Sequence, residues 1–179
     1  MPAIVVPTLS DGEIGVRSLA AADVPALVAA CADPEIPRWT RVPVPYTRED
    51  AERFVAIAAT EARAGEGVAL AVCDSDDRLI GTVGLMEIDR ARGSGELGYW
   101  TAAEARRRGA ATRAVVLVRD WARAELGLSR LEILAHRDNL PSQRVAERAG
   151  FADSGEIRSA PRMPPRIRDG YKVYVWTAE

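Results

Sequence analysis

The segment from Glu96 to Thr112, ELGYWTAAEARRRGAAT, constrains the fold of this 179-residue chain most strongly. Its first six residues have a strand pattern, and a long helical pattern begins at Gly109, so a short loop joins a strand directly to a helix. Three small residues follow Gly109 and leave the first N–H groups of the helix uncovered. Because those groups lack intrahelical partners and carry partial positive charge, this helix start is suited to bind a phosphate.

The loop before this helix contains three consecutive arginines, Arg106, Arg107 and Arg108, which add fixed positive charge. It has neither the Gly-Lys-Ser/Thr of a Walker A loop nor a G-x-G-x-x-G turn, which disfavours a nucleoside triphosphatase. A solvated charge run before a helix would also explain RRRG. Here the run joins a strand to a helix that begins with small residues, so we expect it to hold a diphosphate.

The rest of the chain follows two periodicities. Alternation predicts strands over residues 13–19, 68–73, 79–88, 96–101, 130–135 and 171–176, and a further extended segment from Phe151. Helical spacing predicts helices over residues 23–32, 47–62, 109–127 and 139–149. Four prolines between Asp33 and Tyr46 predict a loop without a helix. This order indicates one domain with a mixed α+β sheet and helices on its faces.

Composition excludes several classes of protein. With 24 basic and 26 acidic side chains the formal charge is −2, so no nucleic-acid partner is expected. Cys31 and Cys73 have no C-x-x-C spacing, which predicts buried free thiols and no metal site. The chain has neither a leader pattern nor an apolar run of about 20 residues, so we expect a cytoplasmic protein without a membrane partner.

Several motifs together resemble the GNAT superfamily of N-acetyltransferases. R-x-x-G-x-A at residues 106–111 is preceded by ELGYW and followed by RDNLPSQRVAERAGF. The early IGVRSLAAADVPALVAACADPEIPRW and TREDAERF resemble the branch of ribosomal-protein N-terminal (alanine/serine) acetyltransferases, so the likeness covers nearly all of residues 1–179. It implies a three-layer α+β domain with a mixed, mostly antiparallel sheet and helices on both faces. Its central strands, 96–101 and 130–135, would splay around acetyl-CoA, the co-substrate.

The resemblance also implies a set of cofactor-binding residues. Backbone groups of Tyr99, Trp100 and Thr101 would hold the pantetheine arm. Asn139 and Ser142, which match the family's N-x-x-S, would reach the cofactor from the other side. An ordinary helix N-cap would equally explain Asn139, and the two roles are compatible. The diphosphate would contact the loop and helix start, namely Arg106, Arg107, Arg108, Gly109, Ala110, Ala111 and Thr112.

Acylation of an amine requires a base, because a primary amine with a pKa near about 10.4 is mostly protonated at neutral pH. We expect Glu96 to be this base, with a solvent-facing glutamate as the alternative. A backbone N–H near Gly98 to Trp100 would stabilise the oxyanion. Many family members carry a tyrosine acid where this chain has Ala146, so Ser142 or Tyr171 would replace it.

The acceptor side is less constrained by sequence. Trp39 and Tyr46, in the proline-rich loop, would bind the acceptor, unless the loop merely packs down on its own tryptophan. The irregular stretch from Arg158 to Asp169 would border the same site, unless its arginines are merely solvated. His136, the only histidine, ends a strand without a partnered nucleophile and is expected to be structural.

These features favour transfer of an acetyl group from acetyl-CoA to a primary amine, on a small molecule or a protein N-terminus, in a ternary complex. A non-catalytic acyl-CoA sensor or interaction module is the alternative, motivated by the missing helix tyrosine. A third hypothesis is nucleic-acid binding through Arg106 to Arg108, but the net charge of the chain argues against it. Sequence leaves the oligomeric state open, with a homodimer as one outcome.

Overall fold

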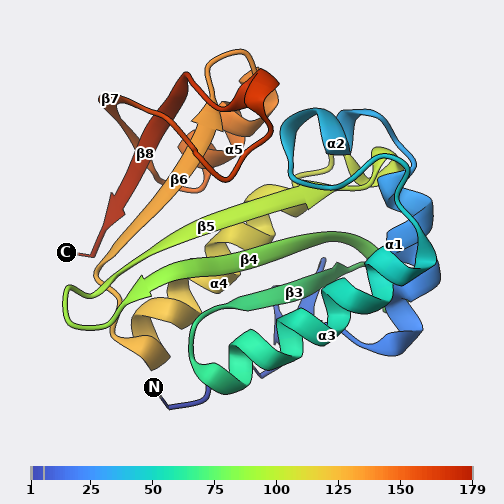
Figure 1. The fold of residues 1–179 in the computed structure, drawn as a ribbon. Coiled ribbons are helices and arrows are strands. Elements are labelled where there is room, and N and C mark those ends of the chain that lie inside the picture. The colour runs from blue at the N-terminus through green and yellow to red at the C-terminus, as the bar shows by residue number, and fades with distance from the viewer. Residues whose placement is uncertain (1, 6, 179) are drawn as a thin grey trace.

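The computed structural model describes residues 2–5 and 7–178 (Figure 1). Its strands are β1 (Leu9–Ser10), β2 (Gly15–Ser18), β3 (Val68–Cys73), β4 (Leu79–Asp89), β5 (Ser94–Thr101), β6 (Arg130–His136), β7 (Ala152–Arg158) and β8 (Tyr171–Thr177). Its α-helices are α1 (Val24–Cys31), α2 (Glu35–Trp39), α3 (Arg48–Ala64), α4 (Ala110–Leu126) and α5 (Leu140–Arg148). Short 3-10 helices are η1 (Ala21–Asp23), η2 (Ala103–Ala105) and η3 (Pro165–Ile167). No helix in this described part has the length and apolar character needed to cross a bilayer.

Within the described residues, eight strands form a single open sheet in the order β1-β2-β3-β4-β5-β6-β8-β7. Neighbouring strands pair antiparallel except for β5 and β6, which run parallel. The chain returns from β5 to β6 through α4, as a parallel crossover requires. The predicted mixed, mostly antiparallel sheet is confirmed, as are the three neighbouring antiparallel strands β3, β4 and β5.

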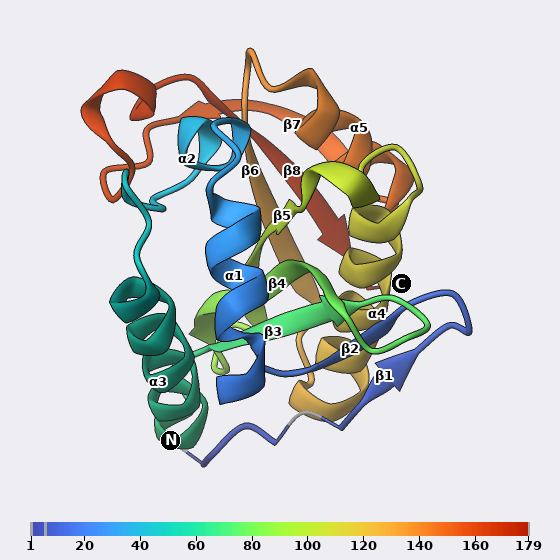
Figure 2. The same cartoon turned by 90° about the vertical axis from the view of Figure 1, so that its right-hand side faces the viewer.

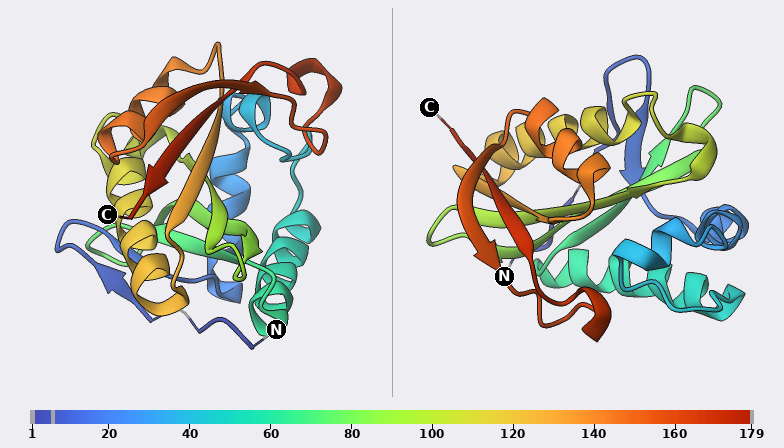
Figure 3. Two further views of the ribbon diagram at one scale, coloured as in Figure 1. Left: turned by 90° about the vertical axis from the view of Figure 1, so that its left-hand side faces the viewer. Right: turned by 90° about the horizontal axis from the view of Figure 1, so that it is seen from above.

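Helices cover both faces of the sheet, as expected (Figures 2 and 3). On one face lie α1 and α3, whose Leu27 and Ala51 pack against β3 and β4. On the other face lie α4 and α5. The predicted apolar stripe of α4 is fully part of the core, since Val115, Val118 and Trp121 are all buried. The sheet therefore separates the start of α4 from α3.

Local sequence signals explain where the helices begin and end. Thr47 and Asp50 form a capping box at the start of α3, in which each side chain accepts a hydrogen bond from the other residue's N–H. Gly65 and Gly127 adopt left-handed conformations at the ends of α3 and α4 (φ 74° and 68°), which glycine adopts at least cost. The predicted bounds of these helices agree with the structure within a few residues.

The prediction that residues 33–46 contain no helix is wrong. Glu35–Trp39 forms the short helix α2, with Pro37 at its third position. A proline is tolerated there because first-turn N–H groups have no intrahelical partner to lose. The prediction also lacked β1, whose two residues are too few for a periodic signal.

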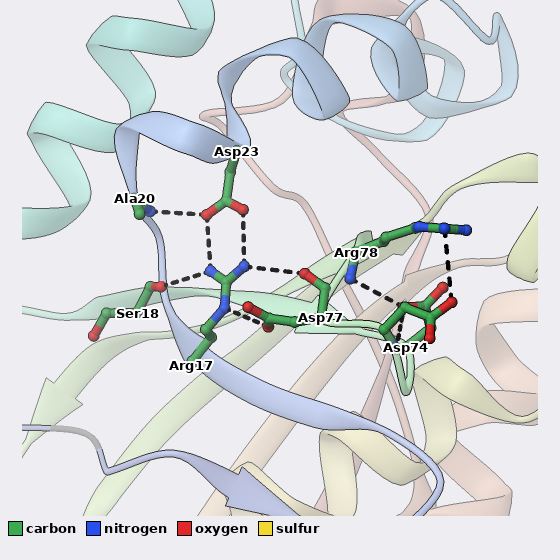
Figure 4. Close-up of polar contacts among 8 residues, drawn as sticks. Arg17, Ser18, Ala20, Asp23, Asp74, Asp77 and Arg78 are labelled. Carbon is green, nitrogen blue, oxygen red and sulfur yellow. Dashed lines mark hydrogen bonds and ion pairs between the residues drawn. The ribbon is translucent and has the colours of Figure 1, made fainter.

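A buried ion pair fixes the amino-terminal strand to the elements beside it (Figure 4). The guanidinium of Arg17, on β2, donates to both carboxylate oxygens of Asp23, at 2.9 and 3.0 Å. It also donates to the carboxylate of Asp77, in the turn between β3 and β4, at 2.8 Å. The Asp23 carboxylate accepts a further hydrogen bond from the Ala20 N–H at 2.8 Å, so this nearly inaccessible group is well satisfied.

Candidate active site

The sheet opens into a cleft between β5 and β6. These parallel strands pair only at their first residues, from Ser94–Arg130 to Glu96–Glu132, and beyond that point no pairing joins them. The cleft has a volume of about 2070 Å³, larger than the roughly 300–1,000 Å³ of a pocket for one small ligand. It is bordered by α2, β4, β5, the loop and first turn of α4, β6, α5 and residues 158–163. It therefore has room for two reactants.

One end of the cleft is the start of α4. Gly109 is the N-cap of this helix with φ 82°, a left-handed conformation in which any other residue is strained. Gly109, Ala110, Ala111 and Thr112 all line the cleft, so the free N–H groups of the first helical turn lie at its wall. The residues present fit a bound diphosphate, because the helix start is positively polarised and small side chains leave it accessible.

The three loop arginines lie in different surroundings. Arg106 lines the cleft, but its guanidinium pairs with Asp33 at 2.6 Å and donates to the Thr101 carbonyl at 3.2 Å. Arg107 is exposed, lines the cleft and has φ 63°. Arg108 is exposed and is not part of the cleft wall. The structure thus brings Arg106 and Arg107 to the site, with Arg106 already held by Asp33, a partner that sequence did not suggest.

The β5 backbone facing the gap is free of strand partners beyond Glu96. Ala102 donates from its N–H to the Ile80 carbonyl on β4 at 2.9 Å. Because backbone groups alternate in direction along a strand, those of Trp100 face β4 as well, while those of Tyr99 and Thr101 face the gap. This geometry favours Tyr99 and Thr101 over Trp100 as backbone partners of a ligand in the cleft.

Asn139 and Ser142 lie across the gap at the start of α5. The Asn139 side chain caps the helix by accepting a hydrogen bond from the Ser142 N–H at 3.2 Å. The Tyr99 hydroxyl donates to the Ser142 carbonyl at 2.9 Å and lies 3.1 Å from the Ser142 Oγ. Burial raises the pKa of Tyr99, so this hydroxyl stays protonated. Asn139 is therefore an N-cap whatever else it binds, and Ser142 has a tyrosine hydroxyl beside its own.

Glu96 lies on the opposite face of β5 from Tyr99. It is the third residue of the strand, is partly buried and lines the cleft. Burial, followed by the negative charges of Glu87 and Glu132, raises the pKa of Glu96 above its ordinary value. Such a carboxylate is a better proton acceptor near neutral pH than an exposed one.

Glu132 is a site residue that sequence reasoning missed. It is the register partner of Glu96 on β6 and lines the cleft. Burial acts to raise its pKa, but hydrogen bonds from Arg158 at 2.7 Å and Arg130 at 2.6 Å outweigh this and hold the pKa of Glu132 low. The detectable signal was an acidic residue in the otherwise apolar strand RLEILA.

His136, the last residue of β6, forms an aromatic cluster with Trp39 of α2 and Tyr171 of β8. The ring of His136 lies 5.4 Å from that of Trp39 and 5.4 Å from that of Tyr171. The His136 Nδ1 accepts a hydrogen bond from the Asp138 N–H at 3.2 Å, and this histidine also lines the cleft. Trp39 thus packs on β6 rather than only on its own loop.

The Tyr171 hydroxyl is buried and has no hydrogen-bond partner within the described residues. Burial, followed by the charge of Glu96, raises the pKa of Tyr171, which places this phenol in the electrostatic field of the carboxylate. A buried hydroxyl without a partner next to a cleft is the kind of group that a ligand or a water satisfies. Tyr171 also lines the cleft.

The remaining predicted residues are placed as follows. Tyr46 lines the cleft and packs against the core under α1 and α3, and burial raises its pKa to about 12. Ala146 is completely buried in the core, so no side chain of α5 reaches the cleft from that position. Cys31 and Cys73 are free and buried, as predicted, and burial raises the pKa of each thiol to about 12.

Known proteins share both this sequence pattern and this fold. Residues 13–152 match the family model described as "Acetyltransferase (GNAT) domain". The "Probable N-acetyltransferase YjcK" of Bacillus subtilis is 46% identical over 85 residues, so the match spans 47% of this chain and 47% of that protein. Mycobacterium smegmatis RimJ, solved with a CoA disulfide, superposes with a TM-score of 0.83 at 20% identity over 99% of this chain and 88% of its own.

A second solved structure, the Microcin C7 self-immunity acetyltransferase MccE in complex with acetyl-CoA and AMP, gives a TM-score of 0.84 at 18% identity over 94% of each chain. At these identities the two structural likenesses concern the fold. The family model, in contrast, matches most of the sequence, including the strand-loop-helix segment and the Asn139–Ser142 motif. The chain belongs to the GNAT family of acetyltransferases.

Proposed function

We propose that this protein transfers the acetyl group of acetyl-CoA directly to a primary amine while both reactants lie in the cleft. The observation that carries the proposal is the separation of β5 and β6 just beyond Glu96 and Glu132. This separation leaves strand backbone unpaired at one end of the cleft, and the start of α4 lies at the other end. The parallel crossover, the splayed strands and the free helix start together form a site for a thioester joined to a diphosphate.

The cofactor residues follow from this arrangement. The first-turn N–H groups of α4, over residues 110–112, would bind the diphosphate, with Arg107 beside them. Backbone groups of Tyr99 and Thr101 would bind the pantetheine arm. Ser142 and Asn139 would contact the cofactor from the side of α5. Residues after the family match, such as Tyr171, also line the cleft, which supports residues 1–179 acting as one domain.

Acetyl-CoA supplies a thioester whose carbonyl carbon the amine attacks. Glu96 takes the proton of the acceptor ammonium, directly or through water, since its raised pKa suits it to accept a proton near neutral pH. The Tyr99 N–H, which faces the gap, donates to the carbonyl oxygen as negative charge develops there. The proton for the departing thiolate comes from Ser142 or Tyr171, which stand on opposite sides of β5. The proton that the acceptor nitrogen loses as the amide forms then restores that hydroxyl.

The acceptor enters from the side of α2. Trp39 and Tyr46 line that part of the cleft and would contact the acceptor's body. Glu87 is paired with Arg162, and Glu132 with Arg130 and Arg158. Glu96 has no arginine partner within the described residues and would attract the ammonium group of the acceptor. A small-molecule amine and a protein N-terminus both satisfy these requirements, and the acceptor is expected to meet the enzyme in the cytoplasm.

The test is an assay of free CoA released from acetyl-CoA with a panel of amines and amino-terminal peptides. Amine-dependent CoA release supports the proposal. A protein that binds acetyl-CoA but releases no CoA with any amine would instead be the acyl-CoA sensor that the missing helix tyrosine suggests. Ala146 supports that second hypothesis, since a buried alanine at this position supplies no proton donor.

A further inference from the structure

The acceptor side of the cleft contains one arginine without a partner. Arg41 follows helix α2, is exposed and lines the cleft. Within the described residues, no ion pair or hydrogen bond involves its guanidinium. The other arginines that line this side, on α2, α3, β6 and residues 158–163, are paired: Arg38 with Glu35, Arg53 with Asp50, Arg130 and Arg158 with Glu132, and Arg162 with Glu87. Arg41 therefore faces the cleft without a competing carboxylate.

Glu96 is the matching anion. Its carboxylate makes no ion pair or hydrogen bond in the described part of the chain, and Glu96 lines the same cleft. The arginines just named neutralise the other acids on this side, apart from Glu61, which is exposed near the end of α3. The positive charge of Arg41 acts on Glu96, yet no ion pair joins the two groups. They therefore lie within electrostatic reach of each other, with a gap between them that exceeds ion-pair distance.

The backbone on both sides of Arg41 is fixed by one threonine. The Thr40 Oγ1 donates to the Ile36 carbonyl of α2 at 2.6 Å and accepts a hydrogen bond from the Val42 N–H at 3.2 Å. These bonds close a turn that has Arg41 at its centre. A preformed turn loses little conformational freedom when its side chain binds a ligand, so more of the binding energy is retained.

Helix α2 is attached to the sheet beside Glu96. The ring of Trp39, its last residue, lies 5.4 Å from the ring of His136 at the end of β6. The guanidinium of Arg166 also donates to the Pro37 carbonyl of α2. Strand β6 is the one that pairs with β5 as far as Glu96. The turn that follows α2 is thus held in a defined position relative to the proposed base.

We propose that Arg41 and Glu96 together select an acceptor that carries a carboxylate as well as its amine. This inference rests on the proposed function, in which Glu96 receives the ammonium group. Arg41 would bind the carboxylate through two parallel N–H groups, the arrangement for which a guanidinium and a carboxylate are matched. A free amino acid has this carboxylate on its own α-carbon, and a peptide has it on an acidic side chain next to the terminal amine. A neutral amine gains nothing from Arg41.

The experiment measures kcat/KM by CoA release for pairs of acceptors that differ only in the carboxylate. One set compares free amino acids with their amides, and the other compares the dipeptide amides Ala-Glu and Ala-Gln. The proteins are the unaltered chain, Arg41→Gln, Arg41→Lys and the control Arg48→Gln. Arg48 is an exposed arginine at the start of α3 that pairs with Glu52 and does not line the cleft. Its replacement removes one positive charge from the surface without touching the site.

The quantity compared between proteins is the ratio of kcat/KM for the acid to kcat/KM for its neutral partner. Amidation changes the pKa of the α-amine, but it does so equally for every protein. Removing Arg41 takes away one of the charges that lower the pKa of Glu96, but this affects both members of a pair. The ratio therefore isolates the contact between Arg41 and the carboxylate.

We expect Arg41→Gln to lower this ratio about tenfold in at least one set, mainly through KM, and Arg48→Gln to leave it unchanged. Arg41→Lys should retain part of the preference, because lysine keeps the charge and loses the fork. A decrease in the first set identifies an amino acid as the acceptor, and one in the second set identifies an acidic peptide.

A ratio that Arg41→Gln leaves unchanged in both sets, or lowers no more than Arg48→Gln does, would overturn the inference. Amine-dependent CoA release by the unaltered chain would then still support the proposed function. If the unaltered chain releases CoA with no amine, charged or neutral, the proposed function itself fails.

Discussion

Replacing Glu132 by glutamine tests how the sheet sets the proton affinity of Glu96. Glutamine keeps the size of the side chain and removes the negative charge that lies beside Glu96 on the next strand. The charged groups around Glu96 are Glu87 and Glu132, which raise its pKa, and Arg158 and Arg41, which lower it. Tyr171 is its neutral titratable neighbour. Losing Glu132 therefore lowers the pKa of Glu96.

The size of the change follows from the strand register. Carboxylates paired across neighbouring strands lie roughly 6 Å apart, and at an effective dielectric constant of about 20 they repel by about 3 kcal/mol. Arg130 and Arg158 partly neutralise Glu132, at 2.6 and 2.7 Å. We therefore expect the pKa of Glu96 to fall, by less than the full repulsion would give.

The assay is the pH dependence of kcat/KM for an amine identified by CoA release. A carboxylate base acts only when ionised, so the acidic limb of the profile moves to lower pH by the same amount. Carbon-13 NMR titration of Glu96 with CoA bound gives the pKa independently of the acceptor. The control is Glu156→Gln, which removes the other carboxylate paired with Arg158. An unchanged limb in Glu132→Gln, or one that moves to higher pH, would refute the reasoning.

Three further variants test other parts of the structure. Glu96→Gln should lower kcat by about 10²- to 10⁴-fold and leave CoA affinity unchanged, and normal turnover would remove Glu96 from the base role. Gly109→Val should weaken CoA binding at least tenfold, because a branched residue is strained at φ 82° and obstructs the helix start. Gly127→Val, strained at the other end of α4, should spare CoA affinity if the obstruction is local. Arg17→Met should destabilise the fold by about 3 kcal/mol, since it leaves the Asp23 carboxylate buried without its cation. The melting temperature should then fall by roughly 6–12 °C, and a fall under 2 °C would contradict this account.

Sequence predicted those parts of the fold that have periodic or capping signals. The apolar stripe of α4 and the capping residues Thr47 and Asn139 are all local signals, and all three are found in the structure. Helix α2 was not predicted, because prolines are normally helix breakers and only its first-turn position makes Pro37 compatible. The splay of β5 from β6 came from family resemblance, since no local pattern encodes where two strands stop pairing.

The candidate site was only partly predictable for the same reason. The small residues after Gly109 and the strand containing Glu96 are contiguous in sequence, so the cofactor segment was visible. The partners that decide what each group can do come from distant segments. Asp33 engages Arg106, and Arg158 engages Glu132, across 73 and 26 positions respectively (106 minus 33, and 158 minus 132). Such pairings depend on how the sheet brings strands together, which periodicity does not show.

The most direct test of the central claim is a crystal structure of the protein grown with CoA. The account predicts the pantetheine arm between β5 and β6 beyond Glu96, with hydrogen bonds to the backbone of Tyr99 and Thr101. The diphosphate should lie within hydrogen-bond distance of the N–H groups of residues 110–112. CoA bound elsewhere, or a structure in which β5 and β6 pair along their full length with no CoA between them, would contradict it.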